Sequence, residues 1–285
     1  MKVSILLNNY NYAPYLGAAI ESALCQTYRD FELLIVDDGS TDGSRAIIDS
    51  YTDPRIVKIY QENAGQGAAF KTGFQHATGD YIAFLDSDDL WDPMKLETCI
   101  GVLEAHPDIT LLNHRYRYID AQGGEMKEPS EFQYTERYDL IADLTRLSTS
   151  LSLSPTSFIM AKRSECLKLG YESSEWRIGA DTPVGIELGM RGRIWNLNLV
   201  LGSYRVHGNN LWYRTLSNEV LYAYFERLYG LANNELKRMG RPGNLDFRRS
   251  QFARGHRASQ SQKFSFERLS WKLFNWGRKK KANHG

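Results

Sequence analysis

Short apolar runs alternate with amphipathic segments over about the first 120 residues, and this alternation is the feature that most constrains the fold. The apolar runs predict strands, and apolar residues at helical spacing between them predict helices. Strands are predicted at 3–7, 31–36, 56–60, 81–85 and from 109, with helices at 14–24, 44–51, 67–77 and 93–105. Strands that alternate with helices predict an α/β fold with a mostly parallel, Rossmann-like sheet and helices on both faces.

Polar clusters follow three of these strands directly. They are Asn8, Asn9, Tyr10 and Asn11 after the first strand, Asp37 and Asp38 after the second, and Asp86, Ser87, Asp88 and Asp89 after the fourth. Parallel strands place their carboxyl ends on one edge of the sheet, and ligands bind beyond that edge. We therefore expect the three clusters to form one site.

The acidic cluster has the chemistry of a metal site. Asp86 and Asp88 should emerge on the same side of the sheet edge, and carboxylate oxygens suit Mg²⁺ or Mn²⁺, which proteins usually share with substrate phosphates. The alternative is an Asp-rich turn that caps the next helix, a role open to Asp89 or to Asp92 before Pro93. The cluster alone leaves both interpretations open.

The second half of the chain has a less regular pattern, and it opens with a turn-rich hinge at 123–130. Helices are predicted at 136–147, 163–169, 181–190 and 217–239, and strands at 157–161, 194–197 and 201–206. We divide the chain into two halves of one domain, residues 1–120 and 121–215, and a helical, basic C-terminal extension, residues 216–285.

Charge is polarised along the chain. From Lys237 onward there are 14 Lys and Arg against 2 Asp and Glu, a net of +12, whereas the preceding 236 residues carry 21 basic and 32 acidic side chains, a net of −11. Phe and Trp interleave with the basic residues of this tail, a pattern typical of segments that lie on anionic membranes. The alternatives are contact with nucleic acid, with the chain's own acidic body, or a solvated helix. We expect no nucleic-acid partner, because the sheet edge is acidic.

The expected location is cytoplasmic, with peripheral attachment at the inner membrane face through the tail. No apolar stretch approaches the roughly 20 residues needed to span a bilayer, and the run at 3–7 is too short for a signal-peptide core. Cys25, Cys99 and Cys166 are far apart and lack CxxC spacing, which is typical of reduced core residues.

Five stretches of the first 95 residues resemble, in order, the opening of family 2 glycosyltransferases. They are 3–12, 19–27, 31–42 (FELLIVDDGSTD), 63–67 (NAGQG) and 79–89 (GDYIAFLDSDD); the resemblance returns around 155–161, Asp181 and 204–210. It implies a GT-A fold and an inverting transfer of sugar from a nucleotide-sugar, with Mn²⁺ or Mg²⁺ on the diphosphate. Residues 1–120 would bind the nucleotide-sugar, and 121–215 would hold the acceptor and the catalytic base.

The resemblance also implies roles for single residues. The nucleotide pocket would be lined by Asn8, Asn9, Tyr10 and Asn11, and Asp38, with Asp37 beside it, would hydrogen-bond the nucleobase. The donor side would also include Gly65, Gln66, Lys71 and Ser87. Asp86 would contact the ribose or the metal, and Asp88 would be the main metal ligand. His207 would reach the metal or the diphosphate, with Arg205 as a further phosphate contact. The alternative for His207 is a structural histidine.

Asp181 is the expected catalytic base, because it stands where the family carries an acidic pair. An inverting transferase needs a carboxylate that takes the proton of the attacking acceptor hydroxyl. The alternative is that Asp181 only caps the helix that begins at Thr182-Pro183.

The chain departs from the family pattern in three places. Asn8 stands where many members have Pro, Ala180 replaces the first acid of the pair, and Phe70-Lys71 replaces a common Arg-Asn pair. The last two departures prompt an alternative function, a catalytically silent domain that binds nucleotide-sugar or glycan. A nucleotidyltransferase is a third alternative, but its Gly-rich loop after the first strand is absent.

The expected partners are a nucleotide-sugar, with a UDP-sugar favoured, and a glycan or lipid-linked acceptor of the kind used in cell-envelope polysaccharide biosynthesis.

Overall fold

The computed structural model describes residues 1–127, 154–170, 175–208, 210 and 218–243. In the first half every predicted strand and helix is present within two residues of its expected bounds, and a short strand, β5, is added. The elements are β1 (Val3–Asn9), α1 (Ala13–Leu24), β2 (Phe31–Asp37), α2 (Ser44–Ser50), β3 (Ile56–Tyr60), α3 (Gln66–His76), β4 (Tyr81–Asp86), β5 (Leu90–Trp91) and α4 (Lys95–Ala105).

The second half follows the prediction less closely. Its elements are β6 (Ile109–Ile119), β7 (Glu125–Met126), η1 (Thr156–Phe158), β8 (Ile159–Lys162), α6 (Arg163–Cys166), α7 (Asp181–Arg191), β9 (Arg193–Arg205) and α9 (Asn218–Arg238). The two strands predicted at 194–197 and 201–206 are one strand, β9. A bulge explains the error: Leu197 pairs with His114 and Val200 with Arg115, so the two residues between them have no cross-strand partner. The start of the predicted hinge forms the turn between β6 and β7.

Two sequence predictions fall outside the described residues. They are the helix at 136–147 and the amphipathic basic tail from 244 onward. Within the described part of the chain, no helix is long and apolar enough to cross a membrane.

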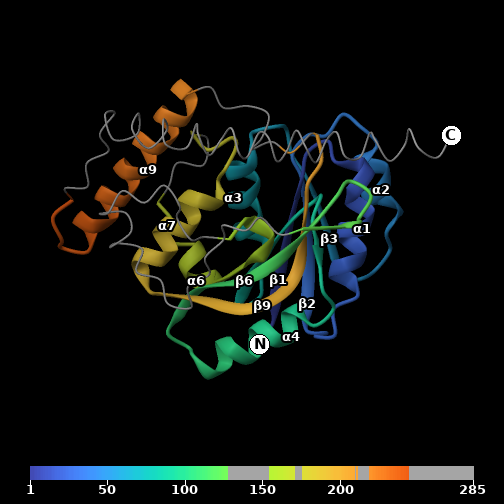
Figure 1. Ribbon diagram of the computed structural model, residues 1–285, viewed down its shortest axis with the longest axis horizontal. Coiled ribbons are helices and arrows are strands. Elements are labelled where there is room, and N and C mark those ends of the chain that lie inside the picture. Colours follow the sequence, from blue (N-terminus) through green and yellow to red (C-terminus); the bar gives the residue numbers. More distant parts are fainter. Residues whose placement is uncertain (128–153, 171–174, 209, 211–217, 244–285) are drawn as a thin grey trace.

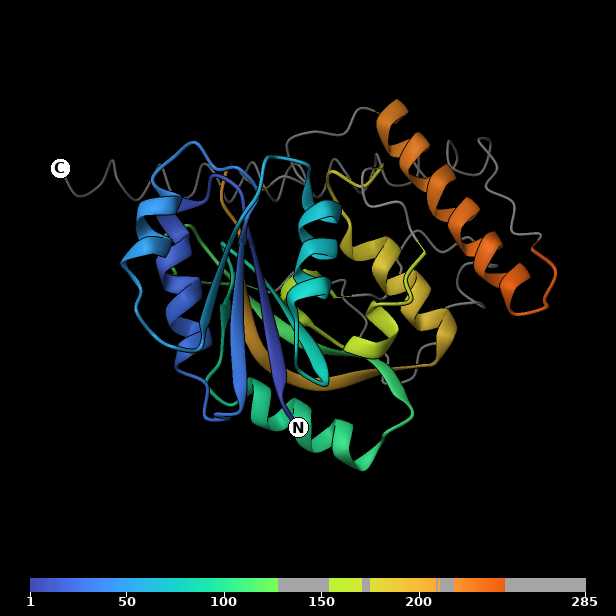
Figure 2. The same ribbon diagram turned by 180° about the vertical axis from the view of Figure 1, so that it is seen from behind.

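The strands form a sheet in the order β3-β2-β1-β4-β8-β6-β9-β5, with β7 beside β6. The first four are parallel, as predicted, and β8 is antiparallel to both of its neighbours. The register pairs Asn9 with Asp37 and Asn8 with Asp86. The carboxyl ends of β1, β2 and β4 therefore meet at one edge of the sheet (Figure 2), which confirms the predicted convergence of the three polar clusters.

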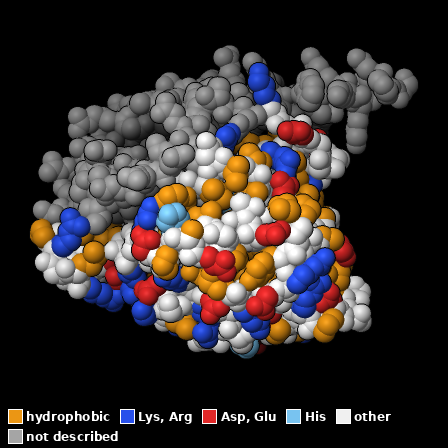
Figure 3. Space-filling model, turned by 90° about the horizontal axis from the view of Figure 1, so that it is seen from below, with side chains coloured by type: hydrophobic (Ala, Val, Ile, Leu, Met, Phe, Trp, Pro, Cys, Tyr) orange, Lys and Arg blue, Asp and Glu red, His pale blue; other side chains and the backbone are white. Residues whose placement is uncertain are grey.

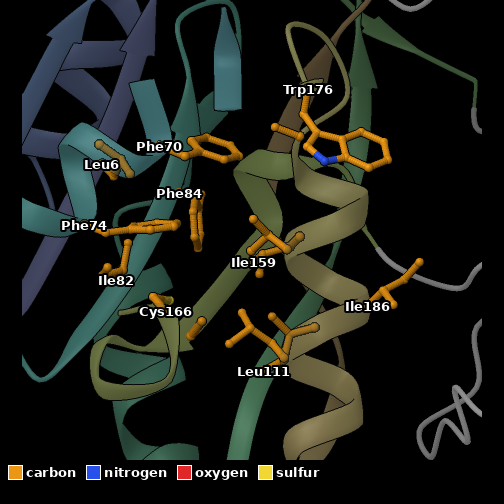
Figure 4. Packing of buried hydrophobic residues seen from close by; sticks show 14 of the residues in the cluster. Leu6, Phe70, Phe74, Ile82, Phe84, Leu111, Ile159, Cys166, Trp176 and Ile186 are labelled. Atoms are coloured by element: carbon orange, nitrogen blue, oxygen red, sulfur yellow. The ribbon is translucent and has the colours of Figure 1, made fainter. Parts of the chain in front are cut away.

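Helices cover both faces of the sheet, and each face has its own buried cluster (Figure 1). One cluster joins the sheet to α1, α2 and α4, and the other joins it to α3, α7 and α9. Phe70 of α3 lies in the second cluster, where its ring packs edge-on against Phe84 at 5.2 Å (Figure 4). Phe70 is therefore a core residue, and its replacement by Ala would lower the free energy of unfolding by about 3–5 kcal/mol.

The edge of the sheet opposite to the site carries mixed charge. Figure 3 views the molecule from this side, and among the described residues Asp and Glu side chains are interspersed there with Lys and Arg. No field of a single sign extends over this face.

Candidate functional site

Asn9 and Asp37 shape the turn that follows β2. The Asn9 Nδ2 donates to Asp37 Oδ2 at 2.8 Å and to Ser40 Oγ at 3.0 Å, and the Ser40 amide donates to Asp37 Oδ1 at 2.9 Å. Both side chains are buried. The Asn9 Nδ2 and both Asp37 carboxylate oxygens therefore stabilise the turn, whereas the Asn9 Oδ1 has no hydrogen-bond partner in the described part of the chain.

Asn11 holds the other side of the same turn. Its backbone has a φ of 59°, in the left-handed region that Asn tolerates better than most residues. Its Oδ1 accepts the Thr41 amide at 2.7 Å, and its own amide donates to Ser40 Oγ at 2.9 Å. Tyr10, between the two asparagines, has 41% of its surface exposed, and Asn11 is exposed as well, so solvent or a ligand can reach both residues.

Asn8 differs from its neighbours. Its side-chain nitrogen and oxygen are both buried, and neither has a hydrogen-bond partner in the described part of the chain. A buried amide without partners costs about 1–3 kcal/mol per group. Asn8 pairs with Asp86 at the sheet edge, and its expected part in a nucleotide pocket stays a prediction.

Asp38 anchors the loop that leads into α3. Its Oδ1 accepts the Gln61 Nε2 at 2.7 Å and the Ala64 amide at 2.9 Å, and its Oδ2 accepts the Gly65 amide at 2.8 Å. Gly65 has a φ of 92°, and a Cβ there would lie 2.5 Å from the Arg177 Cα. The loop is thus pinned between Asp38 and the segment around residue 177. The nucleobase contact expected of Asp38 stays a prediction.

Asp89 is not a helix cap. Its buried carboxylate accepts the Ser157 hydroxyl at 2.6 Å and the Arg205 amide at 2.8 Å, so it joins β4 to η1 and β9. Asp92 does not cap with its side chain either, because its carboxylate pairs with Arg117, and α4 begins without a side-chain cap. The capping alternative is wrong because both carboxylates bind residues far away in the sequence and not the backbone amides of the next helix.

Asp88 faces the segment that follows β9. His207 Nε2 lies 3.0 Å from Asp88 Oδ2, and Asn210 Nδ2 donates to the same oxygen at 3.3 Å. The His207 ring stacks on Tyr15 of α1 at 4.6 Å. Arg205 Nε donates to the Asp88 carbonyl at 2.7 Å. The structure therefore brings Asp88 and His207 together, and it uses Arg205 to hold the turn.

Asp181 is the first residue of α7, and Ala180 occupies the cap position without a side-chain hydrogen bond. A carboxylate in the first turn is favoured by the positive end of the helix dipole. Burial nevertheless raises the pKa of Asp181, and hydrogen bonding to Thr182 and Thr156 only partly offsets the rise. Ala180, one of the departures from the family pattern, is wholly buried among apolar side chains.

Asp181 and the acidic cluster belong to the same site. Burial, followed by the charges of Asp88 and Asp181, raises the pKa of Asp86 well above its usual range. Thr156 hydrogen-bonds to both Asp86 and Asp181, and lowers the pKa of each. Three carboxylates from β4, the turn after it and α7 thus converge, although 95 residues of sequence separate the first from the last.

A divalent cation fits these carboxylates only as a shared ion. Among the described residues, no group of three or more His, Cys, Asp and Glu side chains is arranged to hold a metal. Asp86 and Asp88 raise each other's energy by like-charge repulsion, which a cation would relieve. Mg²⁺ and similar hard cations bind through one or two carboxylates together with substrate phosphates, and this donor set has that form.

Two further expected residues lie near this edge. The Ser87 hydroxyl donates to the Asn8 carbonyl, which ties β4 to β1 and leaves Ser87 buried. Gln66 Oε1 accepts the Ala180 amide at 2.9 Å, so it contacts the residue before Asp181. Lys71 is exposed on α3, and its donor contact stays a prediction.

The sequence analysis missed several residues that hold the site. They are Tyr15, Gln61, Thr156, Ser157 and Asn210. Of these residues, Thr156, Ser157 and Asn210 could have been found from the sequence, because they lie where the family resemblance returns. Nothing in the sequence indicated that Tyr15 and Gln61 belong to the site, since a Tyr on a helix and a Gln in a loop are common at any protein surface.

The chain was compared with known proteins. A model of the family described as Glycosyl transferase family 2 matches residues 4–165. The chain is 37% identical over 214 residues to an uncharacterized glycosyltransferase of Nostoc sp., covering 74% of this chain and 66% of that protein. It is 35% identical over 161 residues to the UDP-Glc:alpha-D-GlcNAc-diphosphoundecaprenol beta-1,3-glucosyltransferase WfgD of Escherichia coli, covering 55% of this chain and 63% of that protein. The chain thus spans less than two thirds of these relatives.

Solved structures share the fold. The UDP complex of residues 1–349 of S. aureus TarS superposes with a TM-score of 0.64 at 19% identity, covering 94% of this chain and 73% of that one. A mannosyltransferase from Pyrobaculum calidifontis, in complex with GDP-Man and Mn²⁺, gives a TM-score of 0.58 at 20% identity, covering 86% and 66%. At these identities the likeness concerns the fold.

Proposed function

The chain belongs to glycosyl transferase family 2 and has the GT-A fold, and on this premise we propose that it is an inverting enzyme with Asp181 as its general base. It would move a sugar from a nucleotide-diphosphate donor to a glycan or lipid-linked acceptor. The observation that carries the proposal is the meeting of Asp181 with Asp86 at Thr156. A separate carboxylate beside the acids expected to meet the donor supports the assignment of Asp181 as the base.

Asp181 has the properties that the base needs. The acceptor hydroxyl would give its proton to the Asp181 carboxylate while its oxygen attacks the anomeric carbon, and the bond to the nucleotide diphosphate would break on the opposite side of the sugar. Burial makes this carboxylate more basic than one in water. A positioned base of this kind contributes about 10²–10⁴-fold to the rate.

Asp88 and Asp86 would hold the divalent cation, with His207 beside Asp88. When bound, the cation would neutralise the charge that develops on the departing diphosphate. The chain's own contribution is orientation: Asn210 and the stacked Tyr15 fix the His207–Asp88 pair, and Ser157 with Arg205 fixes Asp89. The order of the turn after β4 therefore does not depend on the ion alone.

The comparisons support a UDP-sugar donor. The E. coli relative uses UDP-Glc and a diphosphoundecaprenol-linked acceptor according to its name, and the TarS structure contains UDP. The pocket itself would meet the nucleotide with Tyr10 and the unpartnered amide of Asn8.

The positions of Phe70 and Ala180, the two residues that prompted the alternative of a catalytically silent domain, argue against that alternative. Phe70 and Ala180 both lie in the apolar cluster between the sheet and α7, where they fill the core. Both changes leave Asp86, Asp88 and Asp181 in place, and these are the carboxylates that the proposed mechanism uses.

Diphosphate release and sugar transfer test the proposal. UDP-glucose, UDP-galactose, UDP-N-acetylglucosamine and GDP-mannose would each be supplied with Mn²⁺ and diphosphoundecaprenol-linked N-acetylglucosamine. We expect Asp181→Asn to lower kcat by about 10²–10⁴-fold and Asp88→Ala to raise the Mn²⁺ concentration that activity requires. Asp108→Asn, on an exposed carboxylate paired with Arg193, is the matched control. Full activity of Asp181→Asn would refute the base assignment and leave the family intact.

A further inference from the structure

The C-terminal helix α9 contacts the turn that carries Asp181. Figure 2 shows α9 alongside α7, and both helices belong to the same apolar cluster. The Tyr224 hydroxyl of α9 donates to the Gly179 carbonyl at 2.9 Å. The Tyr224 ring meets Trp176 edge-on, with centroids 5.3 Å apart and planes at 85°. The phenol is therefore oriented by packing as well as by its hydrogen bond.

The turn from Gly179 to Asp181 is held from two sides. Gly179 has a φ of 71°, a left-handed conformation that reverses the chain just before α7. On one side the Ala180 amide donates to Gln66 Oε1 at 2.9 Å. On the other side Tyr224 bonds the Gly179 carbonyl and also hydrogen-bonds the Thr182 side chain. Tyr224 thus contacts the residues that bracket Ala180 and Asp181.

We propose that Tyr224 is a positioning residue for Asp181, so that α9 is part of the catalytic apparatus. This inference rests on the proposed role of Asp181 as base. A left-handed glycine turn has few barriers of its own, because glycine populates both signs of φ. The partly buried Tyr224 hydroxyl restricts that freedom from the carbonyl side, as Gln66 does from the amide side. A displacement of about 1 Å in a reacting group can cost about 10²-fold in rate.

The first test is Tyr224→Phe, which keeps the ring against Trp176 and removes only the hydroxyl. With the fastest donor and acceptor of the panel above, we expect kcat to fall about tenfold or more. The KM for the donor should change by less than about twofold, because the substitution removes no group expected to bind the donor in the ground state. Tyr229→Phe, at a buried tyrosine on the same helix, is the control and should leave both values unchanged. Titration with UDP counts the folded sites in every sample.

A double-mutant cycle separates positioning from a general structural role. If Tyr224 acts through Asp181, Tyr224→Phe should cause no further loss in an Asp181→Asn background, because residues that act as a unit are not additive. An equal loss in both backgrounds, or wild-type kcat in Tyr224→Phe, would overturn the inference. Absence of sugar transfer by the wild type would instead refute the proposed function.

Discussion

Lys95 is a wholly buried cation at the start of α4. Its Nζ lies 3.3 Å from the centre of the Trp91 ring, and it has no hydrogen-bond partner among the described residues. Burial lowers the pKa of Lys95 to about 7. A buried amine with this pKa carries an energetic cost whenever it is charged, and the attraction to an aromatic face offsets only about 2 kcal/mol of such a cost.

We predict that Lys95→Met stabilises the protein, by up to about 4 kcal/mol at neutral pH at 1.36 kcal/mol per pKa unit. Below pH 7 both states of the wild type are charged, and the folded state bears the full cost. Between about 7 and 10.5 the folded amine is neutral and the unfolded one is still protonated, so wild-type stability rises with pH. Urea unfolding should therefore show a gain that shrinks towards pH 10.

Lys168→Met is the control for this prediction, because Lys168 is exposed and its ion pair with Glu165 is at the surface. It should change the free energy of unfolding by less than about 0.5 kcal/mol at every pH. A gain for Lys95→Met that did not vary with pH would mean that packing, and not the charge, is responsible.

At the scale of elements, a buried carboxylate joins three segments at the amino ends of the strands. Glu32 of β2 accepts the Ser4 hydroxyl of β1 at 2.6 Å, the Thr78 amide at 2.7 Å and the Lys2 ammonium at 2.9 Å. Burial alone would raise its pKa, but these hydrogen bonds outweigh it and lower the pKa of Glu32 to about 2. The network therefore links β2 to β1 and to the segment that leads into β4, at the end of the sheet opposite to the site.

We predict that Glu32→Gln lowers the free energy of unfolding by about 1–3 kcal/mol at pH 7. Because the folded pKa is depressed, the stabilisation is present above the unfolded pKa near 4.5 and is lost as pH falls towards 2. The gap between variant and wild type in denaturant unfolding should therefore narrow below pH 4.5. Glu97→Gln removes the charge from a carboxylate that accepts a single exposed hydrogen bond, from Thr27, and it should have little effect at either pH.

At the scale of the whole molecule, α9 and the sheet share one apolar cluster. Leu228, Ala232 and Leu236 of α9 are buried in the cluster that contains Phe84 of β4 and Val184 of α7. Arg191 of α7 also lies 3.4 Å from the Glu235 carboxylate of α9. The helix at the start of the predicted extension therefore packs as part of the core.

We predict that Leu228→Ala costs about 2–5 kcal/mol of stability and lowers the midpoint of thermal unfolding without splitting the transition. Circular dichroism and intrinsic fluorescence should give coincident curves, as expected when α9 and the sheet unfold together. Leu199→Ala, at a residue that is 48% exposed, should fall within about 0.5 kcal/mol of wild type. A separate early transition in Leu228→Ala would show that α9 is an independent unit.

The sequence by itself determined the strands and helices of the first half and the convergence of their polar ends. Hydrophobic periodicity is a local property, and the carboxyl ends of parallel strands share an edge whatever the loops do. The positions of Asn8, Asp37 and Asp86 at that edge followed directly. The continuity of β9 through its bulge did not, because the shift in pairing depends on the partner strand β6 and not on the local apolar pattern.

Only the tertiary structure decided what each polar side chain bonds. Asp89 looked like a helix cap and instead binds Ser157 and Arg205, since a buried carboxylate takes the donors that packing brings to it. Tyr224 reaches Gly179 across 45 residues of chain, and no local pattern on an amphipathic helix marks such a contact. The packing of α9 on α7 therefore supplies what sequence alone did not reveal, the support of the turn beneath Asp181.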